Sequence, residues 1–253
     1  MTEAPAALFL DMFGTLVLME PERLPHRLVG GEQRPATIEG VEQLLSTLRP
    51  VVEVESFVAA LGSVSRQIAE EKLASGREIP SRVRFVRTLD SLGLQGPVAS
   101  VAAEMSLRHM QSLARVTVCP PGRRSLLAAL GQGYRLALVS NFDHAPTLRQ
   151  LLEDSGLDGC FEAIVISEEV GWRKPGREIF LHTASLLGVA PARCLHVGDS
   201  YTADIEGAVG AGLRSIHVSA LPAEPCLAEA TIDDIADLPD CLAGLYPVRL
   251  PNV

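Results

Sequence analysis

Short apolar runs alternate with segments of helical period along much of the chain, and this pattern constrains the fold more than any other feature. The apolar runs are typical of buried strands and cover residues 6–10, 134–139, 163–166, 194–197 and 215–218. Helical patterns follow them at residues 123–130, 145–154, 179–187 and 204–211. Near-continuous apolar strands that alternate with helices predict a parallel sheet covered on both faces. We therefore expect an α/β fold with a Rossmann-like doubly wound parallel sheet, and a sixth strand and last helix within residues 230–245.

The segment after the first apolar run lacks this alternation. Its apolar residues recur at helical spacing within residues 38–48, 57–68, 83–89 and 98–113. The sequence thus predicts two domains. An α/β core is formed by residues 1–16 and 116–253, and residues 17–115 form an inserted, mostly α-helical domain.

The charge balance and the hydropathy exclude several classes of protein. Lys and Arg total 22 against 31 Asp and Glu, a net charge of −9, which argues against a general nucleic-acid binder. No apolar stretch is long enough for a membrane span, and the N-terminus lacks the basic start of a signal peptide. The five cysteines are widely spaced without a C-x-x-C pair, which is typical of a reduced, cytoplasmic protein.

Polar residues follow three of the predicted strands. Asp11 ends the first, Ser140 and Asn141 end the second, and Asp199 ends the fourth. Because open parallel sheets bind ligands beyond the carboxyl ends of their strands, we expect these side chains to share one site. Carboxylates that converge there repel one another unless a cation joins them, and oxygen ligands suit Mg²⁺.

These residues carry a family resemblance. The stretch Asp11-Met-Phe-Gly-Thr15-Leu16 resembles the first motif of the haloacid dehalogenase-like (HAD) hydrolase superfamily. Ser140-Asn141 resembles the second motif, Lys174-Pro175 the third, and Gly198-Asp199-Ser-Tyr-Thr-Ala-Asp204 the fourth, all in family order. Each motif alone has an ordinary explanation as a turn or a helix cap, so the interpretation depends on the ordered set. The resemblance implies that residues 17–115 are a cap domain.

The resemblance also implies a role for each motif residue. Asp11 would be the nucleophile, Lys174 would neutralise charge, and Thr15, Ser140 and Asn141 would bind the phosphoryl group. Mg²⁺ would be held by Asp11, Asp199, Asp204 and the backbone carbonyl of Phe13. Asp204 would hold the metal's waters or orient Lys174, and it can also complement a helix dipole. His196 lies within a predicted strand, and we expect it to be a packed core residue.

Phe13 departs from the family pattern, because phosphatases of this family usually carry a second Asp two residues after the nucleophile. An aromatic ring cannot transfer a proton, and general acid–base catalysis typically supplies ~10²–10⁴-fold in rate. We therefore keep three hypotheses. The chain is a Mg²⁺-dependent phosphohydrolase, a 2-haloacid dehalogenase-like hydrolase that forms an aspartyl ester, or a non-catalytic HAD-fold binding protein. Asp199 and Asp204 favour the metal-dependent phosphohydrolase, since the dehalogenase branch needs no metal.

Basic residues give two further predictions. Only two of the 22 are lysines: Lys174 falls in the third motif, and Lys72 is expected to be an ordinary surface residue of the cap. Four cap arginines lie close together in the sequence and are candidate contacts to an anionic substrate, such as a phosphorylated metabolite: Arg77, Arg82, Arg84 and Arg87. A solvated, positively charged helix face is the alternative interpretation of this group.

Overall fold

The computed structural model describes residues 3–29, 31–221 and 226–247. The chain divides into two compact units. The sheet unit comprises Met1–Leu18, Cys119–Asn141 and Leu152–Val253, and the helical unit comprises Met19–Val118 and Phe142–Leu151. The assignment of residues 17–115 to a separate cap domain stays a prediction.

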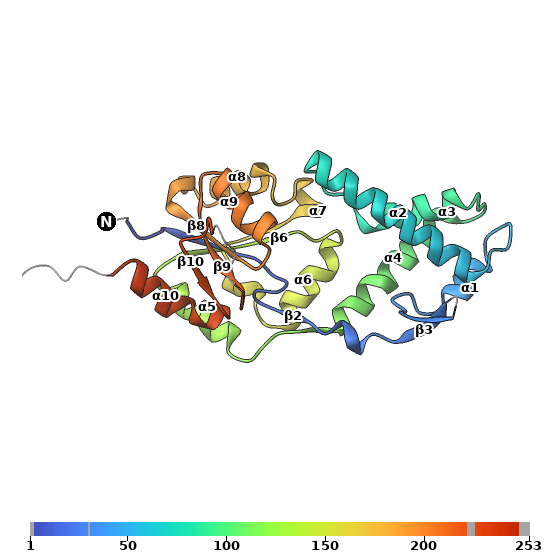
Figure 1. Cartoon of the computed structure of the whole chain (residues 1–253), viewed down its shortest axis with the longest axis horizontal. Coiled ribbons are helices and arrows are strands. Elements are labelled where there is room, and N and C mark those ends of the chain that lie inside the picture. Colours follow the sequence, from blue (N-terminus) through green and yellow to red (C-terminus); the bar gives the residue numbers. More distant parts are fainter. Residues whose placement is uncertain (1–2, 30, 222–225, 248–253) are drawn as a thin grey trace, which may run out of the picture. The chain divides into compact units, whose positions relative to one another are not determined.

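The sheet unit contains a six-stranded parallel sheet with the strand order β10-β9-β8-β1-β6-β7, which confirms the predicted fold class (Figure 1). Its strands are β1 (Ala7–Leu10), β6 (Arg135–Ser140), β7 (Ala163–Ile166), β8 (Cys194–Gly198), β9 (Arg214–Val218) and β10 (Ala230–Ile232). All four residues of the central strand β1 are buried. Both faces of this strand therefore require apolar side chains, and the sequence shows a continuous apolar run there.

Helices cover both faces of this sheet. In Figure 1, α8 (Arg177–Leu186) and α9 (Gly207–Gly210) lie on one side, and α5 (Arg123–Leu130) and α10 (Leu238–Leu245) lie on the other. Phe9 and Val139 from the strands pack in one buried cluster with Phe180 of α8. Shorter elements of this unit are η2 (Asp158–Cys160), α7 (Ser167–Val170), η3 (Pro191–Arg193), η4 (Tyr201–Glu206) and η5 (Ile235–Asp237). The expected helix at residues 204–211 is in fact the π-helical turn η4 followed by α9.

The register of the sheet fixes which residues meet at its carboxyl edge. Leu10 at the end of β1 pairs with Leu138 of β6 on one side and with Val197 of β8 on the other. The residues that follow these three parallel strands therefore emerge side by side. Asp11, Ser140 and Asp199 are brought to one edge for this reason.

The helical unit contains α1 (Val41–Leu45), α2 (Val54–Ser75), α3 (Ser81–Ser91) and α4 (Val98–Arg115), as the spacing of apolar residues predicts. Segment 142–151 adds the first part of α6 (Ala145–Asp154). The core of this unit is built around Phe57 of α2, Phe85 of α3 and Met105 of α4, all fully or almost fully buried.

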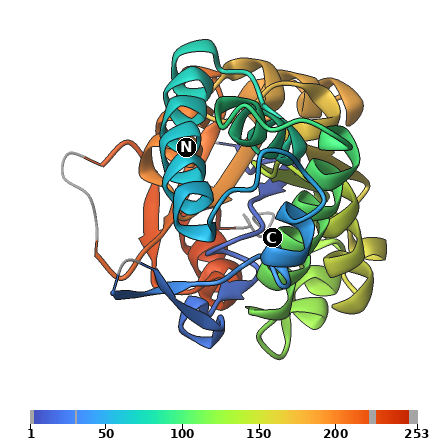
Figure 2. The same ribbon diagram turned by 90° about the vertical axis from the view of Figure 1, so that its right-hand side faces the viewer.

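The start of this unit is not helical, which is compatible with a mostly α-helical domain, but the sequence did not predict the strands there. The strands β3 (His26–Val29) and β4 (Glu32–Pro35) form an antiparallel hairpin, visible as adjacent blue arrows in Figure 2. All residues of β4 are exposed. A strand that is exposed on both faces, as β4 is, has no reason to alternate apolar and polar residues, so no strand pattern appears in its sequence. The remaining short elements are β2 (Leu18–Met19), η1 (Pro21–Arg23) and β5 (Thr117–Val118).

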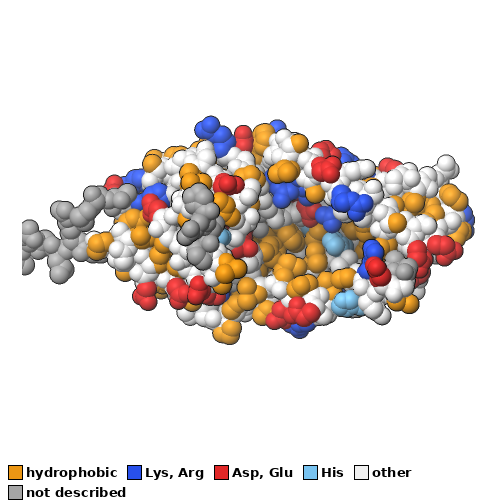
Figure 3. All heavy atoms as spheres, in the orientation of Figure 1, with side chains coloured by type: hydrophobic (Ala, Val, Ile, Leu, Met, Phe, Trp, Pro, Cys, Tyr) orange, Lys and Arg blue, Asp and Glu red, His pale blue; other side chains and the backbone are white. Residues whose placement is uncertain are grey.

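None of the helices in the described residues has the length and hydropathy that crossing a bilayer requires. On the face drawn in Figure 3, acidic, basic and hydrophobic side chains are interspersed.

Candidate active site

Asp11 directly follows the central strand, and the backbone around it is tightly fixed. Its N–H donates to the carbonyl of Val197 at 3.0 Å. The turn continues through Gly14, whose φ of 78° is a left-handed conformation that favours glycine. A Cβ on Gly14 would lie 2.3 Å from a carboxylate oxygen of Asp199. The glycine of the first motif therefore lets the turn after Asp11 approach the fourth motif.

Lys174 joins two of the predicted carboxylates. Its Nζ donates to Asp11 Oδ1 at 2.6 Å and to Asp204 Oδ1 at 2.6 Å. The Lys174 side chain is 2% exposed and that of Asp204 is 1% exposed. Lys174 is thus a buried cation that neutralises charge between the first and fourth motifs, although these motifs are far apart in the sequence.

Asn141 lies against the backbone of Lys174. Its Nδ2 donates to the Lys174 carbonyl, and the Lys174 N–H donates to its Oδ1, both at 2.8 Å. This paired contact fixes the peptide that carries the lysine. A phosphoryl contact of Asn141 stays a prediction, and the structure gives the residue a positioning role as well.

His196 is buried within β8, as expected, and it also contacts Asp204. Its Nε2 lies 2.8 Å from Asp204 Oδ1, and the N–H of Ser200 donates to Asp204 Oδ2 at 2.9 Å. The two contacts hold both oxygens of Asp204. The sequence held one signal for this role, a histidine inside an apolar strand just before Gly198-Asp199.

Burial and neighbouring charges shift the pKa values at this site. Burial raises the pKa of Asp11 to about 7, with Lys174 opposing the rise and Asp204 adding to it. Burial would also raise the pKa of Asp204, but Lys174 and the hydrogen bond from His196 hold it well below its usual range. Burial acts to lower the pKa of Lys174, and its two carboxylate partners nevertheless keep it above its usual value. Lys174 therefore stays charged.

The residues present fit a hard divalent cation. Oxygen atoms of Asp11, Asp199 and Asp204 all lie within 4.8 Å of one another. With Lys174 as their nearest cation, three ionised carboxylates leave two negative charges, which a divalent ion would balance. A Cβ on Gly198 would come within 2.3 Å of Asp204 Cγ, so this glycine makes room for the acidic cluster. The predicted carbonyl ligand, Phe13, lies two residues after Asp11 in the same turn.

Two predicted phosphoryl ligands have unused hydrogen-bonding groups. Thr15 Oγ1 and Ser140 Oγ are buried and have no hydrogen-bond partner among the described residues. Buried hydroxyls normally have hydrogen-bond partners, so these two are available to donate hydrogen bonds to a group bound at this site.

The four candidate arginines of the helical unit have different surroundings. Arg84 Nη2 lies 2.6 Å from Asp143 Oδ2, and Arg87 Nη1 lies 2.6 Å from Glu71 Oε2. Arg77 and Arg82 are exposed. A substrate that met Arg84 or Arg87 would have to compete with an existing ion pair. Their role as substrate contacts stays a prediction.

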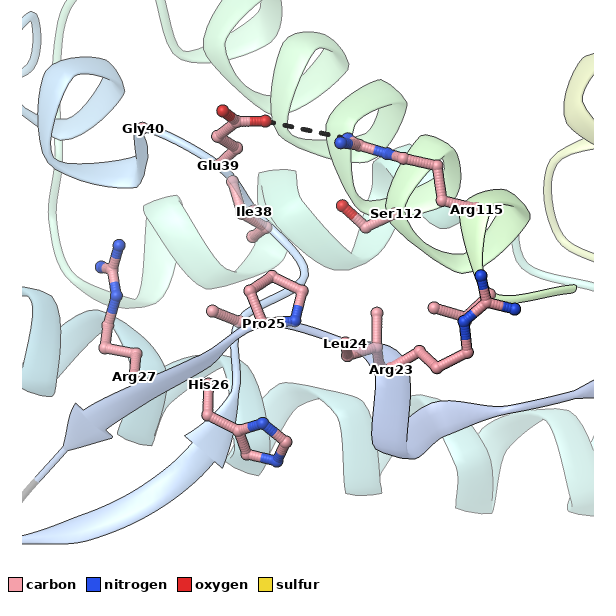
Figure 4. Close-up of a pocket in the computed structure, with 12 residues that line it drawn as sticks. Arg23, Leu24, Pro25, His26, Arg27, Ile38, Glu39, Gly40, Ser112 and Arg115 are labelled. Atoms are coloured by element: carbon pink, nitrogen blue, oxygen red, sulfur yellow. Dashed lines mark ion pairs between the residues drawn. The ribbon is translucent and has the colours of Figure 1, made fainter.

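A cavity of about 550 Å³ lies within the helical unit and involves other residues (Figure 4). Its wall is mixed: Leu24 and Ile38 are apolar, whereas Arg115 and Glu39 are charged, with Arg115 Nη2 lying 3.8 Å from Glu39 Oε2. In the described part of the chain, none of the four candidate arginines lines this cavity. The arginines that line it are Arg23, Arg27 and Arg115.

Comparisons with known proteins agree with the motifs. A family model described as haloacid dehalogenase-like hydrolase matches residues 5–212. Haloacid dehalogenase-like hydrolase domain-containing protein 3 of Bos taurus is 36% identical over 117 residues, 46% of this chain and 46% of that protein. The chain thus spans less than half the length of this relative. A plasmid-encoded phosphoglycolate phosphatase of Cupriavidus necator is 32% identical over 200 residues, 77% of this chain and 84% of that protein.

The fold also matches a solved structure. A 2-haloacid dehalogenase from Pseudomonas syringae pv. Tomato superposes with a TM-score of 0.68 at 20% identity, covering 97% of this chain and 100% of that one. At this level of identity, the similarity shows a shared fold.

Proposed function

The chain belongs to the haloacid dehalogenase-like hydrolase family, and on this premise we propose that it is a Mg²⁺-dependent phosphohydrolase that acts through an aspartyl-phosphate on Asp11. The observation that carries the proposal is the pair of buried, unpartnered hydroxyls, Thr15 Oγ1 and Ser140 Oγ. Oxygens of a bound phosphoryl group would accept hydrogen bonds from both. The phosphoglycolate phosphatase among the relatives supports a small phosphorylated metabolite as the substrate class.

The carboxylate of Asp11 would attack phosphorus and form a new O–P bond while the bond from phosphorus to the ester oxygen breaks. The leaving group would depart as an anion and take its proton from water. Water would then hydrolyse the aspartyl-phosphate, which releases phosphate and restores Asp11. Dividing one difficult displacement into two is the advantage of a covalent intermediate. One carboxylate oxygen of Asp11 binds Lys174, and this contact would orient the other oxygen for attack.

Lys174 would stabilise negative charge on the transferring group. Its ammonium already lies 2.6 Å from the nucleophile, and the Asn141 amide holds its backbone. Preorganised charge in a buried site is worth more than the same charge in water. Asp11, Asp199 and Asp204, with the carbonyl of Phe13, would hold Mg²⁺, which supplies further charge neutralisation when bound. The five cysteines are free thiols, which supports the predicted cytoplasmic location.

Phe13 restricts which esters can react quickly. No proton donor stands at this position, so the leaving group must depart largely as an anion. We therefore expect esters with acidic leaving groups, such as p-nitrophenyl phosphate, to be hydrolysed much faster than alkyl phosphates.

A 2-haloacid dehalogenase activity is the second candidate, and Phe13 is the observation that favours it. Halide leaves without a proton, so Asp11 could attack carbon with no acid present. The three clustered carboxylates weigh against this candidate, because a metal-free reaction gives no reason to keep them together.

One paired assay separates these candidates. Phosphate release from a panel of phosphoesters is measured with Mg²⁺ and with EDTA, and halide release from 2-chloropropionate is measured in parallel. Metal-dependent phosphate release that is lost in Asp11→Asn supports the phosphohydrolase. Metal-independent halide release supports the dehalogenase. If the folded protein shows neither activity, both enzyme proposals are wrong and the chain is better described as a binding protein.

A further inference from the structure

Asp143 lies two residues after Asn141 and is held from three sides within the helical unit. Its Oδ2 accepts hydrogen bonds from Lys72 Nζ at 3.1 Å and from Arg84 Nη2 at 2.6 Å. Its backbone carbonyl accepts the N–H of Ser81 at 2.8 Å. Helices α2 and α3 thus fix both the side chain and the backbone of this one residue.

The contacts of Asp143 belong to a buried ion cluster. Lys72 Nζ also lies 2.6 Å from Glu78 Oε1, so two cations face two carboxylates. The side chains of Lys72 and Glu78 are 9% and 2% exposed. The expectation that Lys72 is a surface residue is therefore wrong. Because desolvation offsets most of the attraction in a buried cluster, its main consequence is a fixed geometry.

Asp143 is also close in the sequence to Asn141, the residue that contacts the backbone of Lys174. Phe142 is the only residue between Asp143 and Asn141, whose amide pairs with the backbone of Lys174. The boundary between the two units falls between Asn141 and Phe142. Consecutive Cα atoms are about 3.8 Å apart, so two peptide links leave little slack between Asp143 and Asn141.

We propose that Asp143 is a positioning residue that couples the helical unit to Lys174. Lys72 and Arg84 fix Asp143, Asp143 fixes the backbone that carries Asn141, and Asn141 fixes the peptide of Lys174. Only the consequence for catalysis rests on the proposed function. The mechanical coupling stands on these contacts alone.

Hydrogen–deuterium exchange on the full chain tests the coupling without any assay of activity. In Asp143→Asn, we expect faster exchange in segment 142–151 and also in residues 172–174, where the Lys174 N–H is bonded to Asn141. The matched control is Glu71→Gln, which breaks the exposed Arg87–Glu71 pair between the same two helices. Faster exchange in segment 142–151 with no change at residues 172–174 would overturn the proposal.

Arg84→Gln provides a second variant if Asp143→Asn does not fold. Arg84 is less buried, with 21% of its side chain exposed, and Lys72 still pairs with Asp143 in this variant. The same two segments should exchange faster, by a smaller factor. An unchanged rate at residues 172–174 alongside a loosened segment 142–151 would again contradict the coupling.

Steady-state kinetics provide an independent test, because a residue with a merely structural role would leave kcat and KM unchanged. For p-nitrophenyl phosphate with Mg²⁺, we expect Asp143→Asn to lower kcat about 10- to 100-fold with a small change in KM, because misplaced catalytic groups mainly slow the chemical step. Glu71→Gln should leave both constants unchanged. If the wild-type protein has no phosphatase activity, the proposed function fails, and the exchange experiment still decides the coupling.

Discussion

Lys72 and Lys174 each place a buried ammonium between two carboxylates. Lys174 lies 2.6 Å from both Asp11 and Asp204, and Lys72 lies 2.6 Å from Glu78 and 3.1 Å from Asp143. The chain has no other lysine and 20 arginines. An ammonium is a compact point charge, whereas a guanidinium is a planar fork, so a small space between two carboxylates suits lysine. The rarity of lysine thus marks two buried ion clusters, one in each unit.

Replacing Lys72 by Met should therefore destabilise the fold strongly. The change leaves Glu78 without its buried cation, and removing one partner of a buried ion pair typically costs about 3–5 kcal/mol. Urea unfolding followed by circular dichroism measures the free energy of unfolding. The matched control is Arg66→Met, an exposed cation on the same helix, for which we expect a change within about 0.5 kcal/mol. Equal effects of the two substitutions would show that the buried charge of Lys72 does not stabilise the fold.

Phe13→Asp should restore the proton transfer that the first motif lacks. A carboxylic acid at this position can protonate the leaving oxygen, so we expect hydrolysis of alkyl phosphates to rise by about 10²–10⁴-fold. Esters with acidic leaving groups should gain much less. Phe13→Asn is the matched control, since the asparagine side chain has nearly the same shape as that of aspartate but has no acidic group. Steady-state rates on both ester classes check the prediction, and equal rates in the Asp and Asn variants would contradict it.

The strands and the central site residues could be predicted from the sequence for a physical reason. Strand β1 is buried on both faces, so its apolar run is unbroken, and the residues after parallel strands share one edge. This rule alone predicts that Asp11 and Asp199 lie at the same edge of the sheet. Lys174 lies on no strand end, and only the resemblance to a family motif identified it.

The features that were missed depend on contacts between distant parts of the chain. Asp143 and Lys72 are 71 residues apart, and nothing local in either segment signals that they meet. The hairpin of β3 and β4 was missed for a local reason, because β4 is exposed along its whole length and its sequence shows no alternation of apolar and polar residues. Asn141 shows a third case, in which the residue was found but its partner, the backbone of Lys174, was not.

Gly14→Ala should damage the acidic site more than backbone strain alone explains. The new Cβ would lie 2.3 Å from Asp199 Oδ2, in addition to the cost of a positive φ. Gly212→Ala is the matched control, because its φ is 82° and nothing lies within 4 Å of its Cβ position. Left-handed backbone costs a non-glycine residue about 1–2 kcal/mol, so both variants should lose that much stability.

The readout that separates the two glycines is the effect of Mg²⁺ on the melting temperature. We expect Mg²⁺ to stabilise the wild type and Gly212→Ala to a similar degree, since binding to the folded state raises its stability. In Gly14→Ala the displaced Asp199 should weaken this stabilisation. A full Mg²⁺ response in Gly14→Ala would mean that Asp199 is not needed to hold the ion.

His109 should make the stability of the protein depend on pH in the acid range. Burial lowers its pKa to about 4, with the Arg84 charge adding to the effect and Asp143 opposing it. Arg84 Nη1 lies 3.5 Å from Nε2 and can only donate, so the neutral ring carries its proton on Nδ1, 2.8 Å from Thr37 Oγ1. The edge-on ring of Phe85 covers another side. Protonation at Nε2 would place a second charge beside Arg84.

The sign of this dependence follows from proton binding in the two states. An unfolded His binds a proton near pH 6.5, whereas the folded one resists it until about pH 4. The free energy of unfolding should therefore fall as pH drops through this window, by at most about 3 kcal/mol, and should be unaffected by His109 above it. We expect His109→Gln to remove this part of the dependence of the free energy of unfolding on pH. His26 is exposed, and we expect His26→Gln to leave the dependence unchanged. Urea titrations at pH 7 and pH 4.5 measure the difference, and parallel losses in wild type and His109→Gln would refute the assignment.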